Sequence, residues 1–309
     1  MKTASFFDFS DVVTQEIELE NSSFRLFVRR EDLIHPFVSG NKFRKLRYNL
    51  AEAEKQNFRK LVTFGGAFSN HIAAVAYAGK QLGFETIGII RGDELEDNWQ
   101  DNPTLVFANS CGMQFEFVSR EVYRTKEDAS FLDSFKTKFG DFYCIPEGGT
   151  NDLAVKGCEE ILTETDKEFD YVCVSVGTVG TISGLINSVF EGQKIIGFPA
   201  LKGDFLQKDI CKFAKKTNWI LNLDYHFGGY GKVTDELIAF INRFKEKTKI
   251  PLDPIYTGKM FFGVLDLIEK DFFKKESKIL LIHTGGLQGI EGINKQLERK
   301  NKDKININD

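Results

Sequence analysis

From residue 59 onward, short runs rich in branched apolar residues alternate with longer segments in which apolar residues recur every three or four positions. Strands of parallel sheets are buried on both faces and read as continuous apolar runs, whereas amphipathic helices show the wider spacing. The alternation therefore predicts an α/β protein with parallel sheets. The expected strands cover residues 24–30, 60–64, 85–91, 114–118, 142–145, 171–176, 194–198, 219–223 and 278–283. The expected helices cover 72–82, 152–162, 181–190, 235–247 and 259–273, with one more beginning near residue 42.

Composition limits the classes of protein that this chain can belong to. At roughly 150 residues per domain, 309 residues correspond to about two domains. Lys and Arg number 41 against 45 Asp and Glu, and 42% of residues are hydrophobic, which excludes a disordered chain and favours neither nucleic acid nor a membrane surface as partner. No apolar run approaches the ~18 residues of a membrane helix. The start of the chain does not resemble a secretory signal.

Histidine and cysteine are too scattered to predict a metal site. The chain has four histidines and five cysteines, and none of them shows the spacing of zinc ligands. We therefore expect no metal and interpret the cysteines as reduced thiols of a cytoplasmic protein. We expect the 30 phenylalanines mainly to fill the core and the polar tail, residues 300–309, to be frayed.

Many of the 27 glycines fall where a predicted strand passes into a predicted helix. In open α/β sheets this is the edge where ligands bind, and glycine lets the backbone approach them closely. The clearest case is VSVGTVGTISGLI, residues 174–186, where free N–H groups and the hydroxyls of Thr178 and Thr181 can hold a phosphate. A tight turn whose glycines serve only packing is the alternative.

Two further segments place polar side chains at helix starts. TFGGAFSNH, residues 63–71, offers a helix N-terminus for a carboxylate, although Ser69 and Asn70 are also ordinary capping residues. SGNKFRKL, residues 39–46, places Lys42 against the positive end of a helix dipole. That position is expected to lower the pKa of Lys42 toward a value suited to covalent or proton-transfer chemistry, unless the lysine is simply solvated.

Weaker motifs follow, and together the motifs indicate one family. GNKFRKL, GGAFSNH, PEGGTN, GTVGTISGL, PIYTGK and HTGG stand in the order seen in pyridoxal-phosphate enzymes of the tryptophan-synthase-β fold. The chain resembles their 1-aminocyclopropane-1-carboxylate deaminase and D-cysteine desulfhydrase family from about residue 29 to residue 286. The resemblance implies two open, twisted, mostly parallel sheets with pyridoxal 5'-phosphate in the cleft between two domains.

The resemblance also implies roles for individual residues. Lys42 matches the lysine that bonds covalently to the cofactor, and Asn70 matches the residue that bonds its phenolic oxygen. Tyr230 and Tyr256 match the two active-site tyrosines. The implied catalytic residues are Lys42, Ser69, Tyr230 and Tyr256. The implied substrate-binding residues are Ser69, Asn70 and His71, and the implied cofactor-binding residues are Lys42, Lys45, Asn70, Gly177, Thr178, Val179, Gly180, Thr181, Thr257 and Thr284.

Two positions tend to separate the two activities of the family. Deaminases typically have Glu after the second tyrosine and Leu in the final His-x-Gly-Gly, whereas this chain has Thr257 and Thr284. A carboxylate beside the pyridine nitrogen strengthens the cofactor as an electron sink, which opening a cyclopropane requires more than expelling a thiolate does. We therefore expect D-cysteine to be converted to pyruvate, hydrogen sulfide and ammonia.

Other functions remain open at this point. They are deamination of 1-aminocyclopropane-1-carboxylate to 2-oxobutyrate, elimination from D-serine or L-cysteine, and non-catalytic binding of pyridoxal phosphate or an amino acid. Phe68 stands where family members commonly have Gln, and residues 72–74 lack the usual Arg, and both departures border the expected substrate site. The resemblance further implies a homodimer, with a large cofactor-binding domain of residues 1–45 and 152–309 and a small inserted domain of residues 46–151.

Overall fold

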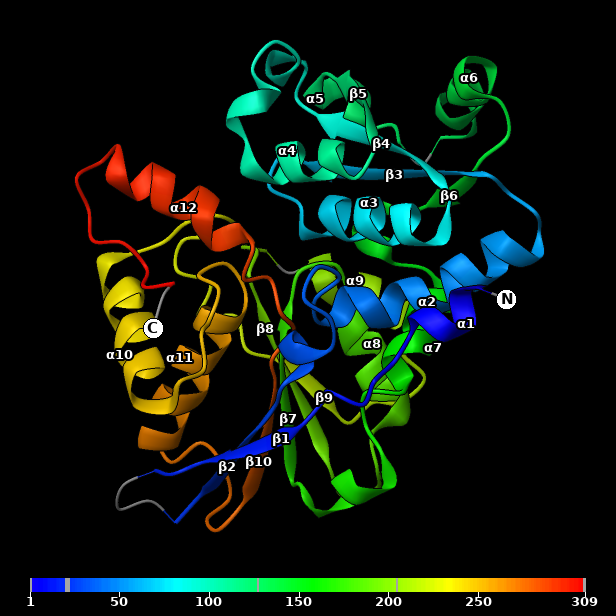
Figure 1. Ribbon diagram of the computed structural model, residues 1–309. Helices are drawn as coiled ribbons and strands as arrows, with labels where there is room; N and C mark the ends of the chain where they lie inside the picture. The colour runs from blue at the N-terminus through cyan, green and yellow to red at the C-terminus, as the bar shows by residue number, and fades with distance from the viewer. Residues whose placement is uncertain (1, 20–22, 127, 204, 308–309) are drawn as a thin grey trace.

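Two mostly parallel sheets, each packed against helices, form the protein (Figure 1). The computed structural model describes residues 2–19, 23–126, 128–203 and 205–307. The larger sheet has the order β1-β2-β10-β7-β8-β9, and only the edge pair β1–β2 is antiparallel. Its strands are β1 (Thr14–Ile17), β2 (Arg25–Arg29), β7 (Tyr171–Val176), β8 (Lys194–Pro199), β9 (Trp219–Leu221) and β10 (Lys278–Ile282). The predicted α/β class with mostly parallel sheets is confirmed.

The smaller sheet is wholly parallel and has the order β5-β4-β3-β6. Its strands are β3 (Lys60–Gly66), β4 (Glu85–Arg91), β5 (Gln114–Val118) and β6 (Tyr143–Ile145). All of them come from one stretch of the chain, and they form the upper lobe in Figure 1. The predicted domain limits at residues 45/46 and 151/152 stay a prediction, because helix α2 runs across the first of them without interruption.

The five bounded helices expected from the sequence all form, with shifted ends. The helices are α1 (Lys2–Phe6), α2 (Asn41–Lys55), α3 (Asn70–Leu82), α4 (Pro103–Ser110), α5 (Arg120–Tyr123), α6 (Ala129–Phe139), α7 (Asp152–Glu159), α8 (Gly180–Ser188), α9 (Phe205–Cys211), α10 (Asp235–Thr248), α11 (Thr257–Glu269) and α12 (Gly289–Glu298). The helix expected over 259–273 ends early because Asp271 adopts a left-handed φ of 52°. Phe272 and Phe273 therefore leave the helix.

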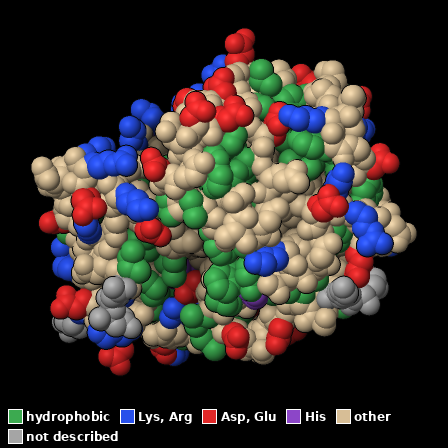
Figure 2. Space-filling model, turned by 45° about the horizontal axis from the view of Figure 1, so that its top comes forward, with side chains coloured by type: hydrophobic (Ala, Val, Ile, Leu, Met, Phe, Trp, Pro, Cys, Tyr) green, Lys and Arg blue, Asp and Glu red, His purple; other side chains and the backbone are tan. Residues whose placement is uncertain are grey.

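Apolar clusters cover both faces of the larger sheet and both faces of the smaller sheet. Along β10, Ile279 and Leu281 pack in one apolar cluster while Leu280 and Ile282 pack in another, as expected when successive side chains point to opposite faces. Phe261 is fully buried, in agreement with a core role for much of the phenylalanine. Figure 2 shows hydrophobic side chains gathered near the middle of one face, with charged side chains of both signs scattered around them.

The C-terminal tail is packed rather than frayed as far as the structure describes it. Ile305 is buried, and its backbone N–H and carbonyl both bond the side chain of Asn294. The expectation of a frayed tail is therefore wrong for residues 300–307, and residues 308 and 309 lie outside the described part of the chain. Within that part, no helix is long and apolar enough to cross a membrane.

Helix α2 joins the two lobes and carries two lysines of the site. It packs closely on α7, where a Cβ atom added at Gly157 would lie 2.0 Å from the backbone oxygen of Arg44. The Arg44 guanidinium donates two hydrogen bonds to the buried carboxylate of Glu31, which anchors the helix from the other side. The start of α2 is thereby fixed above the carboxyl ends of the strands.

Candidate active site

A cavity of about 420 Å³ lies where the carboxyl ends of the two sheets face each other. Gly66 ends β3, while Gly177 and Thr284 follow β7 and β10, so the cavity occupies the edge predicted for ligands. Residues of α2, α3 and α12 complete its wall. It is lined by Asn41, Lys42, Gly66, Ala67, Phe68, Ser69, Asn70, His71, Arg91, Glu147, Gly148, Ser175, Gly177, Thr178, Leu201, Tyr230, Gly231, Asp253, Ile255, Tyr256, Thr284, Gly285, Gly286, Gly289, Ile293 and Gln296.

Lys42 and Lys45 enter this region from the first turns of α2. The Lys42 ammonium nitrogen lies 3.2 Å from the Gly148 carbonyl oxygen. The Lys45 side chain is completely buried and donates to the same oxygen at 3.1 Å and to the Thr178 hydroxyl at 3.0 Å. One backbone carbonyl thus holds both amines on one side of the cavity.

Burial lowers the pKa of both amines. It lowers the pKa of Lys42 well below its usual value, and the neighbouring charge of Lys45 lowers it further. Burial also lowers the pKa of Lys45 to about 8. The expected direction for Lys42 is therefore confirmed, but the leading causes are burial and Lys45 rather than the helix dipole.

The glycine-rich turn before α8 lies beside these lysines, and only part of it faces the cavity. Gly177 and Thr178 line the cavity, and a Cβ atom at Gly180 would lie 3.2 Å from the Lys45 nitrogen. Thr181 is buried and accepts a hydrogen bond from the Asn41 side chain at 2.8 Å, while Val179 is buried behind the turn. The structure does not bring the side chains of Val179 and Thr181 to the cavity wall.

Ser69, Asn70 and His71 stand at the start of α3, and all three line the cavity. Ser69 caps the helix, because its hydroxyl accepts from the backbone N–H of Ile72. The carboxamide oxygen of Asn70 is buried and has no hydrogen-bond partner among the described residues. Buried acceptors normally have partners, so this orphan oxygen indicates a missing ligand group.

His71 presents a second buried side-chain atom without a hydrogen-bond partner. Its Nε2 lies 2.8 Å from the Thr63 hydroxyl, which also lies 2.9 Å from the Ile145 carbonyl oxygen. Its Nδ1 is buried and makes no hydrogen bond of good geometry within the described chain. Burial, with Lys42 and Lys45 nearby, holds the pKa of His71 well below its usual value, so the ring is neutral.

The two tyrosines predicted for the site meet at its edge. Their ring centres lie 6.1 Å apart at 64°, with Tyr230 the more exposed. Burial raises the pKa of Tyr256 well above 10, and Tyr230 raises it further, so Tyr256 keeps its proton. Gly177 makes room for this ring, since a Cβ atom there would lie 2.7 Å from the Tyr256 edge.

The two threonines that separate the family's activities occupy different places. Thr284 lines the cavity, and its hydroxyl lies 3.1 Å from that of Ser175. Thr257 is fully buried, does not line the cavity, and donates its hydroxyl proton to Asp253 at 2.7 Å. The structure therefore places Thr257 behind Asp253 rather than at the wall.

Sequence reasoning did not select three charged residues of the wall, which are Arg91, Glu147 and Asp253. Asp253 accepts hydrogen bonds from the backbone N–H groups of Ile255 and Tyr256 and thereby fixes the turn that carries the tyrosine. The sequence signal that could have identified Asp253 was its position directly before the proline of the PIYTGK motif. Glu147 likewise stands inside PEGGTN.

The family follows from comparison with known proteins. A family model described as "Pyridoxal-phosphate dependent enzyme" matches residues 13–285. The chain belongs to the pyridoxal-phosphate-dependent enzymes. Within them it is a member of the 1-aminocyclopropane-1-carboxylate deaminase and D-cysteine desulfhydrase family, as the motifs predicted.

Several curated relatives match most of the chain. A putative 1-aminocyclopropane-1-carboxylate deaminase of Pyrococcus furiosus is 31% identical, with 85% of each chain covered. A bifunctional D-cysteine desulfhydrase/1-aminocyclopropane-1-carboxylate deaminase of Arabidopsis thaliana is also 31% identical, over 86% of this chain and 73% of the relative. A solved structure described as an ACC deaminase homologue superposes with a TM-score of 0.79 at 27% identity, over 94% of this chain and 93% of the other.

The residues of the cavity fit the cofactor of this pyridoxal-phosphate-dependent enzyme. A phosphate at the Gly177–Thr178 turn would meet the Thr178 hydroxyl and the Lys45 ammonium group. The orphan oxygen of Asn70 lines the same cavity, where a ring substituent would give it a partner. Lys42 also lines it with its pKa lowered, as a covalent link to an aldehyde requires.

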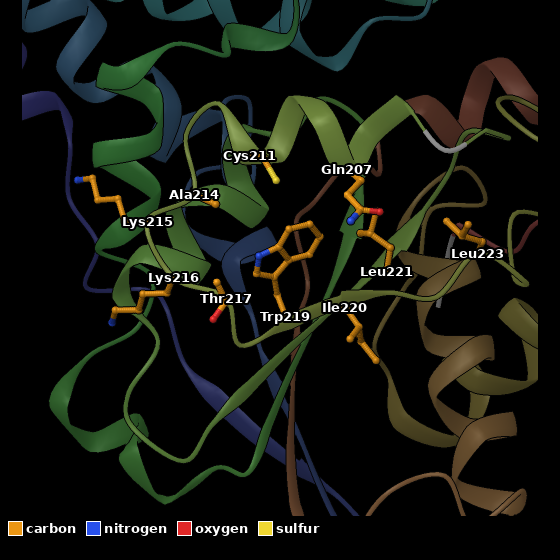
Figure 3. A pocket seen from close by; sticks show the side chains of 10 residues that line it. All are labelled: Gln207, Cys211, Ala214, Lys215, Lys216, Thr217, Trp219, Ile220, Leu221 and Leu223. Atoms are coloured by element: carbon orange, nitrogen blue, oxygen red, sulfur yellow. The ribbon is translucent and has the colours of Figure 1, made fainter.

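A second, larger hollow of about 710 Å³ lies along the edge strand β9 and is lined by none of the residues that fit the cofactor (Figure 3). Its wall surrounds the indole of Trp219, and the side chains of Lys215 and Lys216 extend away from that ring. None of the residues predicted for catalysis lines it. The smaller cavity between the sheets is therefore the candidate active site.

Proposed function

We propose that this enzyme carries out α,β-elimination on a small amino acid, with D-cysteine as the substrate that yields pyruvate, hydrogen sulfide and ammonia. The proposal draws its reaction class from relatives named as 1-aminocyclopropane-1-carboxylate deaminases and D-cysteine desulfhydrases. The observation that carries the choice of D-cysteine is the neutral Thr284–Ser175 hydroxyl pair at the ends of β10 and β7. A neutral hydroxyl strengthens the electron sink less than a carboxylate does, and expulsion of a good leaving group such as thiolate requires less of that sink.

Lys42 is proposed to take the proton from Cα. An amine accepts a proton only when it is uncharged, and burial together with Lys45 favours the uncharged form of Lys42. Bound pyridoxal phosphate supplies the electron sink for the pair left on Cα. The Gly148 carbonyl, which lies 3.2 Å from the Lys42 nitrogen, keeps the amine on the cavity side of α2.

The start of α3 is proposed to bind the substrate carboxylate. The positive end of the helix dipole and the Ser69 hydroxyl lie there, and both favour an anion. Asn70 would bond the phenolic oxygen of the cofactor. The neutral His71 lines the same cavity, and its unpartnered Nδ1 is proposed to bond the substrate.

The tyrosines are proposed to act at sulfur. Tyr256 keeps its proton at ordinary pH, because burial raises its pKa, so it can donate to the departing sulfur atom. Tyr230 lies against the Tyr256 ring and is more exposed, which suits a residue that orients the substrate at the cavity mouth.

A substrate panel scored for both sulfide and keto acid tests the proposal. Purified enzyme loaded with the cofactor is expected to release equal amounts of sulfide and pyruvate from D-cysteine. The panel also contains L-cysteine, D-serine and 1-aminocyclopropane-1-carboxylate. Dominant 2-oxobutyrate from the last compound would favour the deaminase instead, which is the activity named for the Pyrococcus relative. Binding of cofactor without turnover of any compound would favour a non-catalytic binding protein.

A further inference from the structure

Arg91 is a charged residue of the cavity wall to which the proposed elimination assigns no role. It is the last residue of β4, and its side chain is exposed to the cavity. Among the described residues, no carboxylate pairs with its guanidinium and no side-chain hydrogen bond engages it. An arginine fork that faces a ligand cavity without a partner has the geometry to bind a carboxylate in a bidentate manner.

The guanidinium of Arg91 lies beside the end of β3, the strand that leads to Ser69. Arg91 pairs with Gly66 on the neighbouring strand β3, and its Nη2 lies 3.5 Å from the place where a Gly66 side chain would begin. The side chain therefore folds across the end of β3, just before the turn that leads to Ser69. A larger residue at position 66 would occupy the space beside the guanidinium.

Tyr123 supports the guanidinium from behind. The guanidinium carbon lies 5.7 Å from the centre of the Tyr123 ring, within reach of a cation–π interaction. The Tyr123 hydroxyl in turn donates to the Glu147 carboxylate at 2.9 Å, and Lys126 lies 3.4 Å from the same carboxylate. Glu147 is thus engaged by two other groups, so the charge of Arg91 remains available to a ligand.

Lys42 and Arg91 reach the cavity from different places. Lys42 is held at Gly148, beyond the end of β6, and Arg91 ends β4, with β3 between these two strands. With the substrate α-carboxylate at the start of α3, a carboxylate bound by Arg91 would belong to a substituent beyond Cβ.

We propose that Arg91 binds a second carboxylate, carried by the side chain of the amino-acid substrate. The inference rests on the proposed elimination and names the substrate class as cysteine derivatives with a carboxylate on the sulfur substituent. In the reaction the Cα proton leaves, the Cβ–S bond breaks, and its electron pair departs with sulfur as a mercapto acid. The remaining three-carbon fragment takes up one water and gives pyruvate and ammonium, so no oxidant or reductant is needed.

An isosteric pair of substrates tests this role. S-carboxymethyl-cysteine and S-carbamoylmethyl-cysteine have the same shape, but only the first carries the second negative charge, and both enantiomers of each are assayed. The enzyme is expected to prefer the carboxylate in kcat/KM by about 10- to 100-fold, the ratio expected for one charge-assisted hydrogen-bonded contact. Arg91→Gln is expected to bring the ratio close to one, and Arg91→Lys to keep part of it.

Arg59→Gln serves as the matched control, because Arg59 is exposed at the opposite end of the same sheet, just before β3. It is expected to leave the preference unchanged. A wild-type ratio near one, or an equal loss on both compounds in Arg91→Gln, would overturn the proposal. The equal loss would mean that Arg91 binds the α-carboxylate that both compounds share.

A binding measurement separates this inference from the reaction on which it rests. The change in absorbance of the bound cofactor on adding each compound gives a dissociation constant without turnover. If neither compound nor D-cysteine is cleaved, the proposed elimination fails, but the ratio of the two dissociation constants still tests Arg91. A ratio of about 10 or more that Arg91→Gln removes supports the second carboxylate site, and a ratio near one contradicts it.

Discussion

At the residue scale, folding transfers the Lys45 amine from water into the protein interior. Its side chain is completely buried, and burial lowers its pKa to about 8 from 10.5. Below pH 8 the amine is protonated in both the folded and the unfolded chain, so the cost of burying the charge is complete. Above about pH 10.5 it is neutral in both states and the cost disappears. Stability should therefore rise with pH across this window.

Lys45→Met isolates that effect in the cofactor-free protein. Between pH 7.5 and pH 10 the free energy of unfolding should rise by about 2 kcal/mol more in the wild type than in the variant. Urea unfolding of both proteins at the two pH values measures the difference. Titrating groups that do not interact with Lys45 cancel because both proteins share them, whereas Lys42 adds to the difference because Lys45 lowers its pKa. An equal rise in both proteins would show that Lys45 is not the source.

Only some residues of the candidate site could be predicted from the sequence. Lys42 and Asn70 could be selected from short motifs whose residues are neighbours in the chain. Arg91 and Glu147 become wall residues only because β4 and β6 flank β3, which is a long-range arrangement. At the end of a strand, a lone arginine looks like an ordinary solvated residue.

At the scale of elements, close contacts at glycine fix α2 against α7. A Cβ atom at Gly157 would lie 2.0 Å from the Arg44 backbone oxygen and 2.9 Å from its carbonyl carbon. Backbone atoms cannot turn aside as a flexible side chain can, so α2 itself would have to move. The start of that helix carries Lys42, so this packing is coupled to the position of the reacting amine.

Gly157→Ala tests the coupling of the two helices. Alanine favours a helix over glycine by up to about 1 kcal/mol, but overpacking costs about 1–3 kcal/mol, so a net loss of stability and weaker cofactor binding are expected. Chemical denaturation and cofactor titration measure both. Asp152→Ala, at an exposed position of α7, is the control. A variant that is more stable than the wild type and binds the cofactor equally well would contradict the expectation.

Buried strands were the elements that sequence best predicted. The bounds of β4 and β7 match the expected ranges, because strands buried in a parallel sheet read as largely apolar runs. The bounds of β5 also match, although QFEFV is a partly exposed edge strand that alternates polar and apolar residues. Strand β1 was missed because TQEI is short, polar and at an edge. Helix α12 was missed because Gly289 and Gly292 interrupt its helical pattern.

At the scale of the whole molecule, the candidate active site is assembled in the cleft between two lobes. The chain has only four histidines, and its site is built from other residues that lie far apart in the sequence. Lys42 comes from the helix that joins the lobes, Asn70 from the small sheet's side, and Thr284 from the large sheet. Through the family resemblance, the order of motifs along the chain predicted that these residues meet in one site. Composition alone predicted only the number of domains. The homodimer and the domain limits stay predictions.

The central claim is that Lys42 is the residue that carries the cofactor. Borohydride reduction of the cofactor-loaded protein, followed by peptide mapping with mass spectrometry, tests it directly. Lys45 and Lys259 are also buried lysines whose pKa burial lowers to about 8, so the chain offers real competitors. We expect the reduced cofactor on the peptide containing Lys42 and its loss, with the yellow colour, in Lys42→Ala. Label on Lys45 or Lys259, or a colourless wild type after reconstitution, would contradict the account.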